Sequence, residues 1–214
     1  MQNVLRAFED INTFSDFEYT EMCSYHWEAP VPYRPETYCK IGIVAGVLIA
    51  SIKCYETNPK AVYTKRDEPI YKDSYLEFFV APVENKNEYV NVECNANGAF
   101  LCEFGAERGN RSLVSSFASL SPVVEPFKGE DDNGAFWGVT VKLTKDFVSD
   151  IYDVPVNDVT FNVVRANFYK CGDECETPHY IAFSPVTTLP PGFHNPECFK
   201  EFQMISGDNK NEYH

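Results

Sequence analysis

Two neighbouring segments indicate the fold most clearly, Asp73-Ser-Tyr-Leu-Glu77-Phe-Phe-Val80 and Tyr89-Val-Asn-Val-Glu-Cys-Asn95. In an extended strand, successive side chains point to opposite faces of the sheet. One face of each segment is therefore apolar, with Leu76, Phe78, Val80, Val90, Val92 and Cys94. The other face combines carboxylates, amides and aromatic rings, with Asp73, Tyr75, Glu77, Phe79, Tyr89, Asn91, Glu93 and Asn95. A face of this kind is costly to bury and suits a polyhydroxylated ligand, which points toward sugar binding.

Further strand-like runs recur along the chain, at residues 38–44, 47–56, 99–104, 136–143, 159–169 and 179–183. The 14 Pro and 11 Gly break up any long helical pattern, and one short helix is predicted at 145–152 with Thr144 as its N-cap. This spacing favours an all-β fold over alternating β and α units. We predict an antiparallel two-sheet β-sandwich, jelly-roll-like, with one or two short helices. It would form one domain over residues 1–214, with its core at about 25–204.

The dipeptide Asn97-Gly98 predicts a hairpin between two alternating runs. Asn-Gly is typical of a two-residue type I′ turn, which fixes the strand register. In that register Glu93 lies opposite Cys102, and Asn95 and Asn91 lie opposite Phe100 and Phe104. Two aromatic rings would then extend the polar face, because cross-strand partners point to the same side.

Composition narrows the range of partners. The chain has 32 acidic and 18 basic residues, a formal net charge of -14. A surface this acidic repels the phosphates of nucleic acids and anionic lipids, so neither is an expected partner. The most apolar stretch, residues 41–52, is also too short to cross a membrane. Neutral sugars remain compatible, and 13 Tyr and 17 Phe offer flat, amphipathic contact surface.

The N-terminal residues carry no basic region followed by an apolar run, so no secretory signal is predicted. We expect a cytoplasmic protein, although a chain whose signal had been removed would be extracellular. The eight cysteines are expected as free thiols, because Cys54 and Cys94 occupy inward-facing strand positions where Cys behaves as a small hydrophobe.

Several side chains outside the first two segments are candidates for ligand contacts. Arg108 and Arg111 follow the predicted hairpin, where each guanidinium could bind a sugar or pair with an acidic neighbour. Trp27 lies in a loop bounded by prolines, a suitable place for a stacking ring, whereas Trp137 is expected in the core. Asn167 lies on a half-apolar strand face, either as a ligand contact or within a buried network.

Three other kinds of chemistry remain open. Glu77 and Glu93, on neighbouring strands, could form the carboxylate pair of a glycan-active hydrolase. The segment Cys171-Gly-Asp-Glu-Cys175-Glu-Thr-Pro-His179, with His194 and Cys198 beyond it, contains zinc-binding residue types at a looser spacing than the usual knuckle. A heme-binding or redox domain on a related sandwich would need an axial His or Met pair.

A series of motifs spread over nearly the whole chain resembles one known family. They are Tyr71-Lys-Asp-Ser-Tyr-Leu-Glu-Phe-Phe79, Tyr89-Val-Asn-Val-Glu-Cys-Asn-Ala-Asn-Gly98, Gly105-Ala-Glu-Arg108, Asn167-Phe-Tyr-Lys-Cys-Gly-Asp173, Pro178-His-Tyr180 and Phe193-His-Asn-Pro-Glu197. Together they are similar to the family 9 carbohydrate-binding modules, over residues 25–204 or so. The resemblance implies a β-sandwich of two antiparallel sheets that grips glucan or xylan chain ends between aromatic rings. Some members also hold a structural calcium ion.

By position, the resemblance assigns hydrogen-bonding roles to Glu77, Arg108 and Asn167. Where related proteins commonly show Ser-Trp before a late proline, this chain has Ala182-Phe183, so Phe183 would form one side of the aromatic clamp. The closing Phe-Gly of the family is replaced by Phe199-Lys200. These departures, and the lack of a predicted signal, favour a soluble oligosaccharide over insoluble polysaccharide.

The sequence therefore predicts non-catalytic binding of an oligosaccharide or a glycan chain end, in the setting of polysaccharide catabolism. No cofactor is required, and the presence of a metal is left open. The predicted ligand-binding residues are Trp27, Glu77, Asn91, Glu93, Arg108, Arg111, Asn167 and Phe183.

Overall fold

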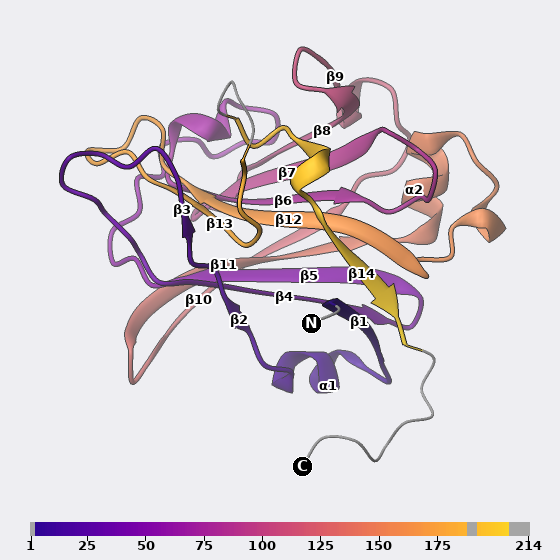
Figure 1. Ribbon diagram of the computed structural model, residues 1–214, viewed down its shortest axis with the longest axis horizontal. Coiled ribbons are helices and arrows are strands. Elements are labelled where there is room, and N and C mark those ends of the chain that lie inside the picture. Colours follow the sequence, from indigo (N-terminus) through magenta and orange to yellow (C-terminus); the bar gives the residue numbers. More distant parts are fainter. Residues whose placement is uncertain (1–2, 188–191, 206–214) are drawn as a thin grey trace.

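The computed structural model describes residues 3–187 and 192–205, and strands dominate this part of the chain (Figure 1). The strands are β1 (Asn3–Phe8), β2 (Thr20–Glu21), β3 (Ser24–Tyr25), β4 (Thr37–Val44), β5 (Val47–Cys54), β6 (Tyr75–Ala81), β7 (Tyr89–Asn95), β8 (Phe100–Glu107), β9 (Asn110–Leu113), β10 (Val123–Asp131), β11 (Gly134–Leu143), β12 (Val163–Cys171), β13 (Tyr180–Ala182) and β14 (Lys200–Met204). The α-helices described are α1 (Ile11–Asp16) and α2 (Lys145–Tyr152). The predicted all-β class is confirmed.

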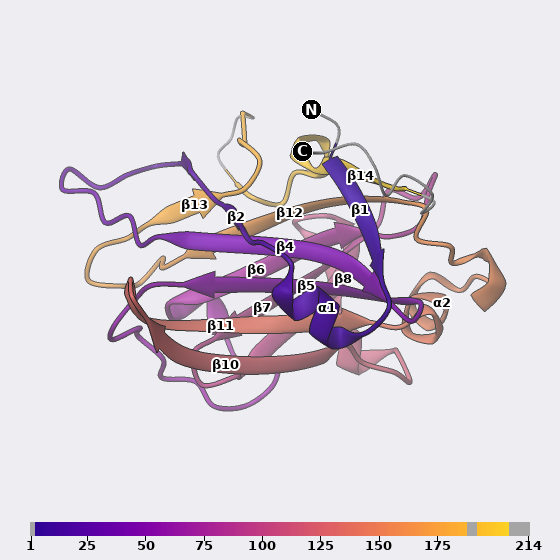
Figure 2. The same ribbon diagram turned by 90° about the horizontal axis from the view of Figure 1, so that it is seen from below.

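The strands form one curled sheet in the order β10-β11-β5-β4-β1-β14-β12-β6-β7-β8-β9. Strand β1 joins its two halves, since residues 3–5 pair with β14 and residues 6–8 pair with β4. Both of these pairings are parallel, so the expectation of a purely antiparallel fold is wrong at this position. Figure 2 shows β1 crossing between the two halves.

The two halves of the sheet face each other across the main core (Figure 1). Leu48, Ile52 and Val139 come from β5 and β11 on one side, and Phe78 and Phe168 come from β6 and β12 on the other. All five side chains are at most 1% exposed. Trp137 is also buried in this core, as expected.

The outer face of β6, β7 and β12 is covered by a second apolar cluster, which includes Tyr75, Phe79, Tyr89, Tyr169 and Phe193. The alternation predicted for residues 73–80 and 89–95 is confirmed, because Leu76 and Val92 enter the main core while Tyr75 and Tyr89 face outward. The candidate site lies on this outer face.

Helix α2 matches the sequence prediction, including its cap. The Oγ1 of Thr144 accepts a hydrogen bond from the backbone N–H of Phe147 at 3.1 Å, which satisfies one of the free donors of the first turn. Helix α1 is capped in the same way by Asp10, whose Oδ1 accepts from the backbone N–H of Thr13 at 2.9 Å.

The hairpin between β7 and β8 differs from the prediction by one residue. The backbone N–H of Gly98 donates to the carbonyl of Asn95, and the N–H of Asn95 donates to the carbonyl of Ala99, so the loop has three residues. Gly98 has φ +81°, the left-handed residue that follows a type I turn in such loops. Glu93 therefore lies opposite Leu101, and Asn91 opposite Glu103.

This slip moves two aromatic rings to the other side of the sheet. Phe100 and Phe104 pack against the main core, so the expectation that they extend the polar face is wrong. Leu101 and Glu103 take their place beside Glu93. Among the described residues no helix is long and apolar enough to span a membrane.

Candidate functional site

A pocket of about 480 Å³ opens on the outer face of β6 and β7. Its lining residues come from six separate parts of the chain: Trp27, Tyr71, Tyr75, Glu77, Glu93, Leu101, Glu103, Arg108, Asp173, Tyr180, Gly192, Phe193 and His194. Four of the predicted ligand-binding residues, Trp27, Glu77, Glu93 and Arg108, are brought together here.

Two buried carboxylates form the floor of the pocket. Glu77 on β6 and Glu93 on β7 are direct cross-strand partners, and each is 4% exposed. One oxygen of Glu93, Oε1, accepts a hydrogen bond from Asn91 Nδ2 at 3.1 Å, and Glu77 Oε2 lies 3.7 Å from the Sγ of Cys171, a weak donor. The other oxygen of Glu93, Oε2, is buried and has no hydrogen-bond partner within residues 3–187 and 192–205. A buried acceptor without a partner costs free energy that a ligand donor would recover.

Both carboxylates hold protons more tightly than usual. Burial raises the pKa of Glu77 well above its ordinary value, and the charges of Glu93 and Asp173 raise it further. Burial likewise raises the pKa of Glu93 to about 8, with additional contributions from Glu103 and Asp173. These are the shifts expected when like charges share a poorly hydrated site.

A third carboxylate, that of Asp173, stands at the wall of the pocket just beyond the end of β12. Its Oδ2 accepts a hydrogen bond from the hydroxyl of Tyr75 at 2.7 Å. Burial raises the pKa of the Tyr180 hydroxyl, and its hydrogen bond to Asp173 raises it further. Two tyrosines therefore orient this carboxylate at the pocket edge.

Aromatic rings form the opposite wall. The ring of Trp27 lies 4.9 Å from that of Phe193 and 5.5 Å from that of Tyr180, measured between centroids. Phe193 is itself stacked on Tyr169 at 4.1 Å. Pairing of β3 with β13 sets the position of Trp27, since the N–H of His26 donates to the carbonyl of Tyr180 at 2.9 Å. Trp27 remains 39% exposed, so part of its face is open to a ligand.

Arg108 is exposed in the turn between β8 and β9 and lines the pocket. It forms no hydrogen bond or ion pair with any other residue in the ranges 3–187 and 192–205. Histidine 194 also lines the pocket, with its Nδ1 2.9 Å from the hydroxyl of Tyr89. Burial lowers the pKa of His194 to about 3, helped by Arg111 and Arg108, so the ring is neutral at physiological pH.

Two predicted residues support the pocket from behind. The Arg111 side chain is 2% exposed and donates to the carbonyls of Tyr89, Glu103 and Gly105 at 2.7–3.1 Å. Its Nε also donates to Asn91 Oδ1 at 3.0 Å. Asn91 in turn donates to Glu93, so both residues hold Glu93 in place and neither lines the pocket.

The other two predicted residues lie elsewhere. Asn167 is fully buried, with Nδ2 donating to the carbonyl of Ser184 at 3.0 Å and Oδ1 accepting from the N–H of Ser184 at 2.8 Å. It therefore belongs to the satisfied internal network considered as its alternative role. Phe183 stacks on Phe202 at 6.0 Å and packs against the main core, so the structure does not place it as a wall of the pocket.

Several pocket residues were not predicted: Tyr71, Tyr75, Leu101, Glu103, Asp173, Tyr180, Gly192, Phe193 and His194. Six of them occur inside the family-like motifs, which was a signal for their importance but not for their roles: Tyr71, Tyr75, Asp173, Tyr180, Phe193 and His194. Phe193 takes the position that the prediction gave to Phe183.

The proposed zinc ligands do not converge. Cys171 faces Glu77 at the pocket floor, whereas His179 lies in a different cluster with its Nε2 2.6 Å from Lys170 Nζ. No group of three or more His, Cys, Asp or Glu side chains in residues 3–187 and 192–205 is placed to hold a metal ion. All eight cysteines lie in the described ranges as free thiols.

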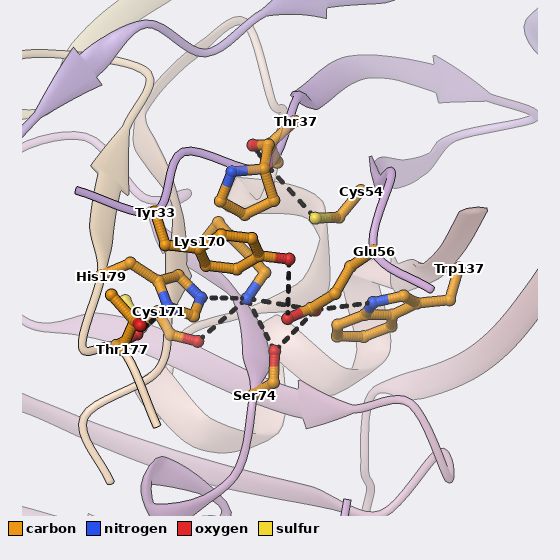
Figure 3. Close-up of polar contacts among 11 residues, drawn as sticks. Tyr33, Thr37, Cys54, Glu56, Ser74, Trp137, Lys170, Cys171, Thr177 and His179 are labelled. Atoms are coloured by element: carbon orange, nitrogen blue, oxygen red, sulfur yellow. Dashed lines mark hydrogen bonds and ion pairs between the residues drawn. The ribbon is translucent and has the colours of Figure 1, made fainter. Parts of the chain in front are cut away.

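A second buried polar cluster lies on the other side of β12, around Lys170 (Figure 3). Lys170 Nζ donates to Ser74 Oγ at 2.7 Å and lies 3.4 Å from Glu56 Oε2. Glu56 also accepts from Ser74 Oγ at 2.7 Å and from Trp137 Nε1 at 3.1 Å. We call these residues, with His179, the Lys170 cluster. Its charges are paired and hydrogen-bonded, as buried charges in a stable core usually are.

Structural comparison finds similar proteins of known structure. A candidate carbohydrate-binding protein from Bacteroides uniformis ATCC 8492 matches with a TM-score of 0.72 and 26% sequence identity, over 95% of this chain and 98% of that chain. A family 9 carbohydrate-binding module from Caldicellulosiruptor kristjanssonii in complex with cellotriose matches with a TM-score of 0.61, over 98% of this chain and 96% of that chain. The same organism's module in complex with glucose matches with a TM-score of 0.59 over the whole of both chains. At 9% identity the last two matches show the fold alone.

No curated protein matches this sequence. The model of carbohydrate-binding family 9 matches residues 8–204, which is most of the 214-residue chain. This chain belongs to carbohydrate-binding family 9.

Proposed function

We propose that this protein binds a soluble oligosaccharide or a glycan chain end in the pocket on β6 and β7, without cleaving it. One observation carries the proposal: Glu93, with a buried carboxylate oxygen that has no partner among the described residues, lines the same pocket as the Arg108 guanidinium and an aromatic wall. Glu77, Glu93 and Arg108 would bond sugar hydroxyls. Trp27 and Phe193 would pack on the C–H face of a pyranose ring, in place of the Phe183 expected from sequence.

Hydrolysis is the alternative, and the electrostatics of the pair count against it. A glycosidase needs one carboxylic acid and one ionised carboxylate in differing environments. Here burial raises the pKa of both Glu77 and Glu93, so neither is set apart as the ionised partner. Incubation with chromogenic glycosides tests this alternative, since release of the chromophore would require a catalytic role.

The heme or redox alternative has less support. Within the described residues, His194 is the histidine that lines the pocket, and its Nδ1 contacts the Tyr89 hydroxyl. An absorbance spectrum of the purified protein tests it, because bound heme gives a strong Soret band.

Calorimetric titration with glucose, cellotriose and xylo-oligosaccharides tests the binding proposal. We expect heat of binding with at least one of them, and a loss of about tenfold or more in affinity for Arg108→Ala and for Trp27→Ala. Phe117→Ala is the matched control, because Phe117 is an exposed ring outside the pocket. A folded protein that gives no heat with any of these sugars would contradict the proposal.

Three further features belong to the same proposal. The curled sheet would be a two-layered, jelly-roll-like β-sandwich, and residues 1–214 would form one domain. Sugar binding would need no cofactor, and a structural calcium ion would serve stability alone. Repeating the titration and a thermal melt after chelation with EDTA separates an effect of calcium on sugar binding from an effect on stability.

The protein would act in polysaccharide catabolism, within the cytoplasm. Cell fractionation tests this location.

A further inference from the structure

The pocket is lined by more acidic than basic side chains. Four carboxylates line it, those of Glu77, Glu93, Glu103 and Asp173, against one guanidinium, that of Arg108. Glu103 is offset from behind by Arg111 at 3.8 Å. Arg108 lowers the pKa of Glu77 and Arg111 lowers that of Glu93, but Glu93 and Asp173 raise the pKa of Glu77 more than Arg108 lowers it. The pocket is thus built to accept positive charge.

The deepest carboxylate also lacks a donor. Glu93 is 4% exposed, and its Oε2 has no hydrogen-bond partner among the described residues. A neutral hydroxyl would satisfy one acceptor but would not offset the repulsion that arises when Glu77 and Glu93 both ionise. An ammonium group has three donors and one charge, so it can bond both carboxylates and remove the like-charge repulsion.

The aromatic wall suits the same group. The rings of Trp27, Tyr180 and Phe193 stand beside the carboxylates, and the face of an aromatic ring attracts a cation. A pyranose that stacks on these rings would keep an amino substituent within the pocket. Sugar acids, in contrast, would bring a further negative charge to a pocket that four carboxyl groups line.

We propose that the pocket selects sugars bearing a free amino group, of the glucosamine class, over neutral, N-acetylated and acidic sugars. This inference rests on the proposed function, because it names the ligand class of the same pocket. The ammonium would lie between Glu77 and Glu93, and Arg108 would bond the hydroxyls at the other end of the ring.

Proton release gives this binding mode a signature. In the free protein Glu93 holds a proton at neutral pH, because burial raises its pKa to about 8, and burial raises the pKa of Glu77 as well. An ammonium placed between them favours their ionised forms, so binding expels at least part of a proton to solvent. The charged and titratable groups that face the pair are Tyr75, Tyr89, Glu103, Arg108, Arg111, Tyr169, Cys171 and Asp173.

Calorimetric titration of the full chain near neutral pH tests the proposal with four sugars: glucosamine, glucose, N-acetylglucosamine and glucuronic acid. We expect glucosamine to bind at least about tenfold more tightly than glucose, because an added charge-assisted contact is worth this much. N-acetylglucosamine should bind no more tightly than glucose, and glucuronic acid more weakly. Ethanolamine carries the ammonium without the ring, and binding as tight as that of glucosamine would overturn the requirement for a sugar.

Two variants sharpen the comparison. Glu93→Gln should bring the affinity ratio of glucosamine to glucose close to one, since it removes the charge at the same shape. Glu130→Gln removes the same charge from an exposed site on β10, outside the pocket, and should leave the ratio unchanged. If Glu93→Gln bound neither sugar, titration of the unaltered protein in buffers of different ionisation enthalpy would decide. Proton release with glucosamine but not with glucose supports the proposal.

The outcomes separate this inference from the proposed function. Glucose that binds as tightly as glucosamine, without proton release, would overturn the selection of amino sugars and leave sugar binding intact. A folded protein that binds none of the sugars would contradict the proposed function itself.

Discussion

Strand β12 separates two buried polar clusters that differ in how their charges are balanced. On one side, Lys170 is fully buried, and its ammonium contacts Glu56, Ser74 and His179 (Figure 3). On the other side, Glu77 and Glu93 face each other, and an oxygen of Glu93 has no partner in the part of the chain that the structure describes. Both clusters are buried, so burial alone does not mark a site. The acceptor without a partner marks the site, because a network whose donors and acceptors are all paired has no free group to bind a ligand.

The same difference appears in the acid–base behaviour of the two clusters. Burial alone would raise the pKa of Glu56, but Lys170, Ser74 and Trp137 hold it below its ordinary value. Burial raises the pKa of Glu93 to about 8, and its acidic neighbours add to the shift. One carboxylate is thus stabilised as an ion by the fold, and the other is kept protonated until a partner arrives.

The largest effect is expected where the balanced cluster is broken. Lys170→Met should lower the free energy of unfolding by about 3–5 kcal/mol, because it leaves Glu56 buried without its cation. Urea unfolding measures this loss. Lys142→Met is the matched control, since Lys142 pairs with Glu125 at 2.7 Å on the surface, where ion pairs contribute less than about 1 kcal/mol.

A second substitution tests whether the loss comes from the unpaired charge. Adding Glu56→Gln to Lys170→Met should recover part of the stability, because the orphaned carboxylate is removed. A loss below about 1 kcal/mol for Lys170→Met alone would contradict a structural role for the cluster.

The two arginines near the pocket offer the next comparison. Arg111→Met should lower the free energy of unfolding by about 3 kcal/mol, because three carbonyls and Asn91 lose a buried donor. Arg108→Met should leave stability within about 0.5 kcal/mol, since the side chain is exposed and pairs with none of the described residues, yet weaken sugar binding. Denaturation curves and calorimetric titrations of both variants check this. Equal losses of stability in the two variants would contradict the assignment.

Stability should respond to pH in opposite directions at the two clusters. The pKa of Glu93 is about 8 in the folded protein and has its ordinary value of 4.5 in the unfolded chain. Between pH 4.5 and 8 the folded protein therefore keeps this proton and the unfolded chain loses it. The contribution of Glu93 to the free energy of unfolding is therefore complete below pH 4.5. It declines as the pH rises to about 8, by up to about 1.4 kcal/mol per pH unit. Glu56 behaves in the reverse way, because its pKa is lowered and its contribution is lost as the pH falls below its ordinary value.

Urea unfolding across this pH range, with and without Glu93→Gln, measures the first effect. The variant should flatten the decline between pH 4.5 and 8, since the amide carries no proton to lose. An unchanged slope would show that Glu93 does not titrate with the raised pKa assigned to it.

Local patterns in the sequence were sufficient for part of this picture. Alternation over residues 73–80 and 89–95 predicted which side chains face outward, and Thr144 marked the start of α2. Strand β1 carried no comparable signal, because its parallel partners lie far away in the sequence at β4 and β14. The β7–β8 register was missed because an Asn-Gly pair fits both a two-residue turn and the last positions of a three-residue loop.

The site was harder to predict than the fold for the same reason. Glu77, Glu93, Arg108 and Trp27 were found from strand faces, a loop and motif positions. Asp173, Tyr180 and Phe193 reach the pocket through tertiary packing of the segments after β12, which no local pattern reports. The sequence could not distinguish Asn167 from a ligand-binding residue. Its hydrogen bonds are made to the backbone of Ser184, which the fold brings next to it.

The smallest expected effect separates two phenylalanines that the sequence could not distinguish. Phe183→Leu should leave sugar affinity unchanged and lower the free energy of unfolding by less than about 1.5 kcal/mol, because Phe183 packs beside Phe168 and Phe202 in the main core. Phe193→Leu should weaken sugar binding by roughly fivefold, the loss of about 1 kcal/mol of ring contact in the pocket. Calorimetric titration of both variants with the same sugar makes the comparison. A greater loss of affinity in Phe183→Leu would return the stacking role to the residue that family position suggested, and would place the ligand on the other face of the sheet from Glu93.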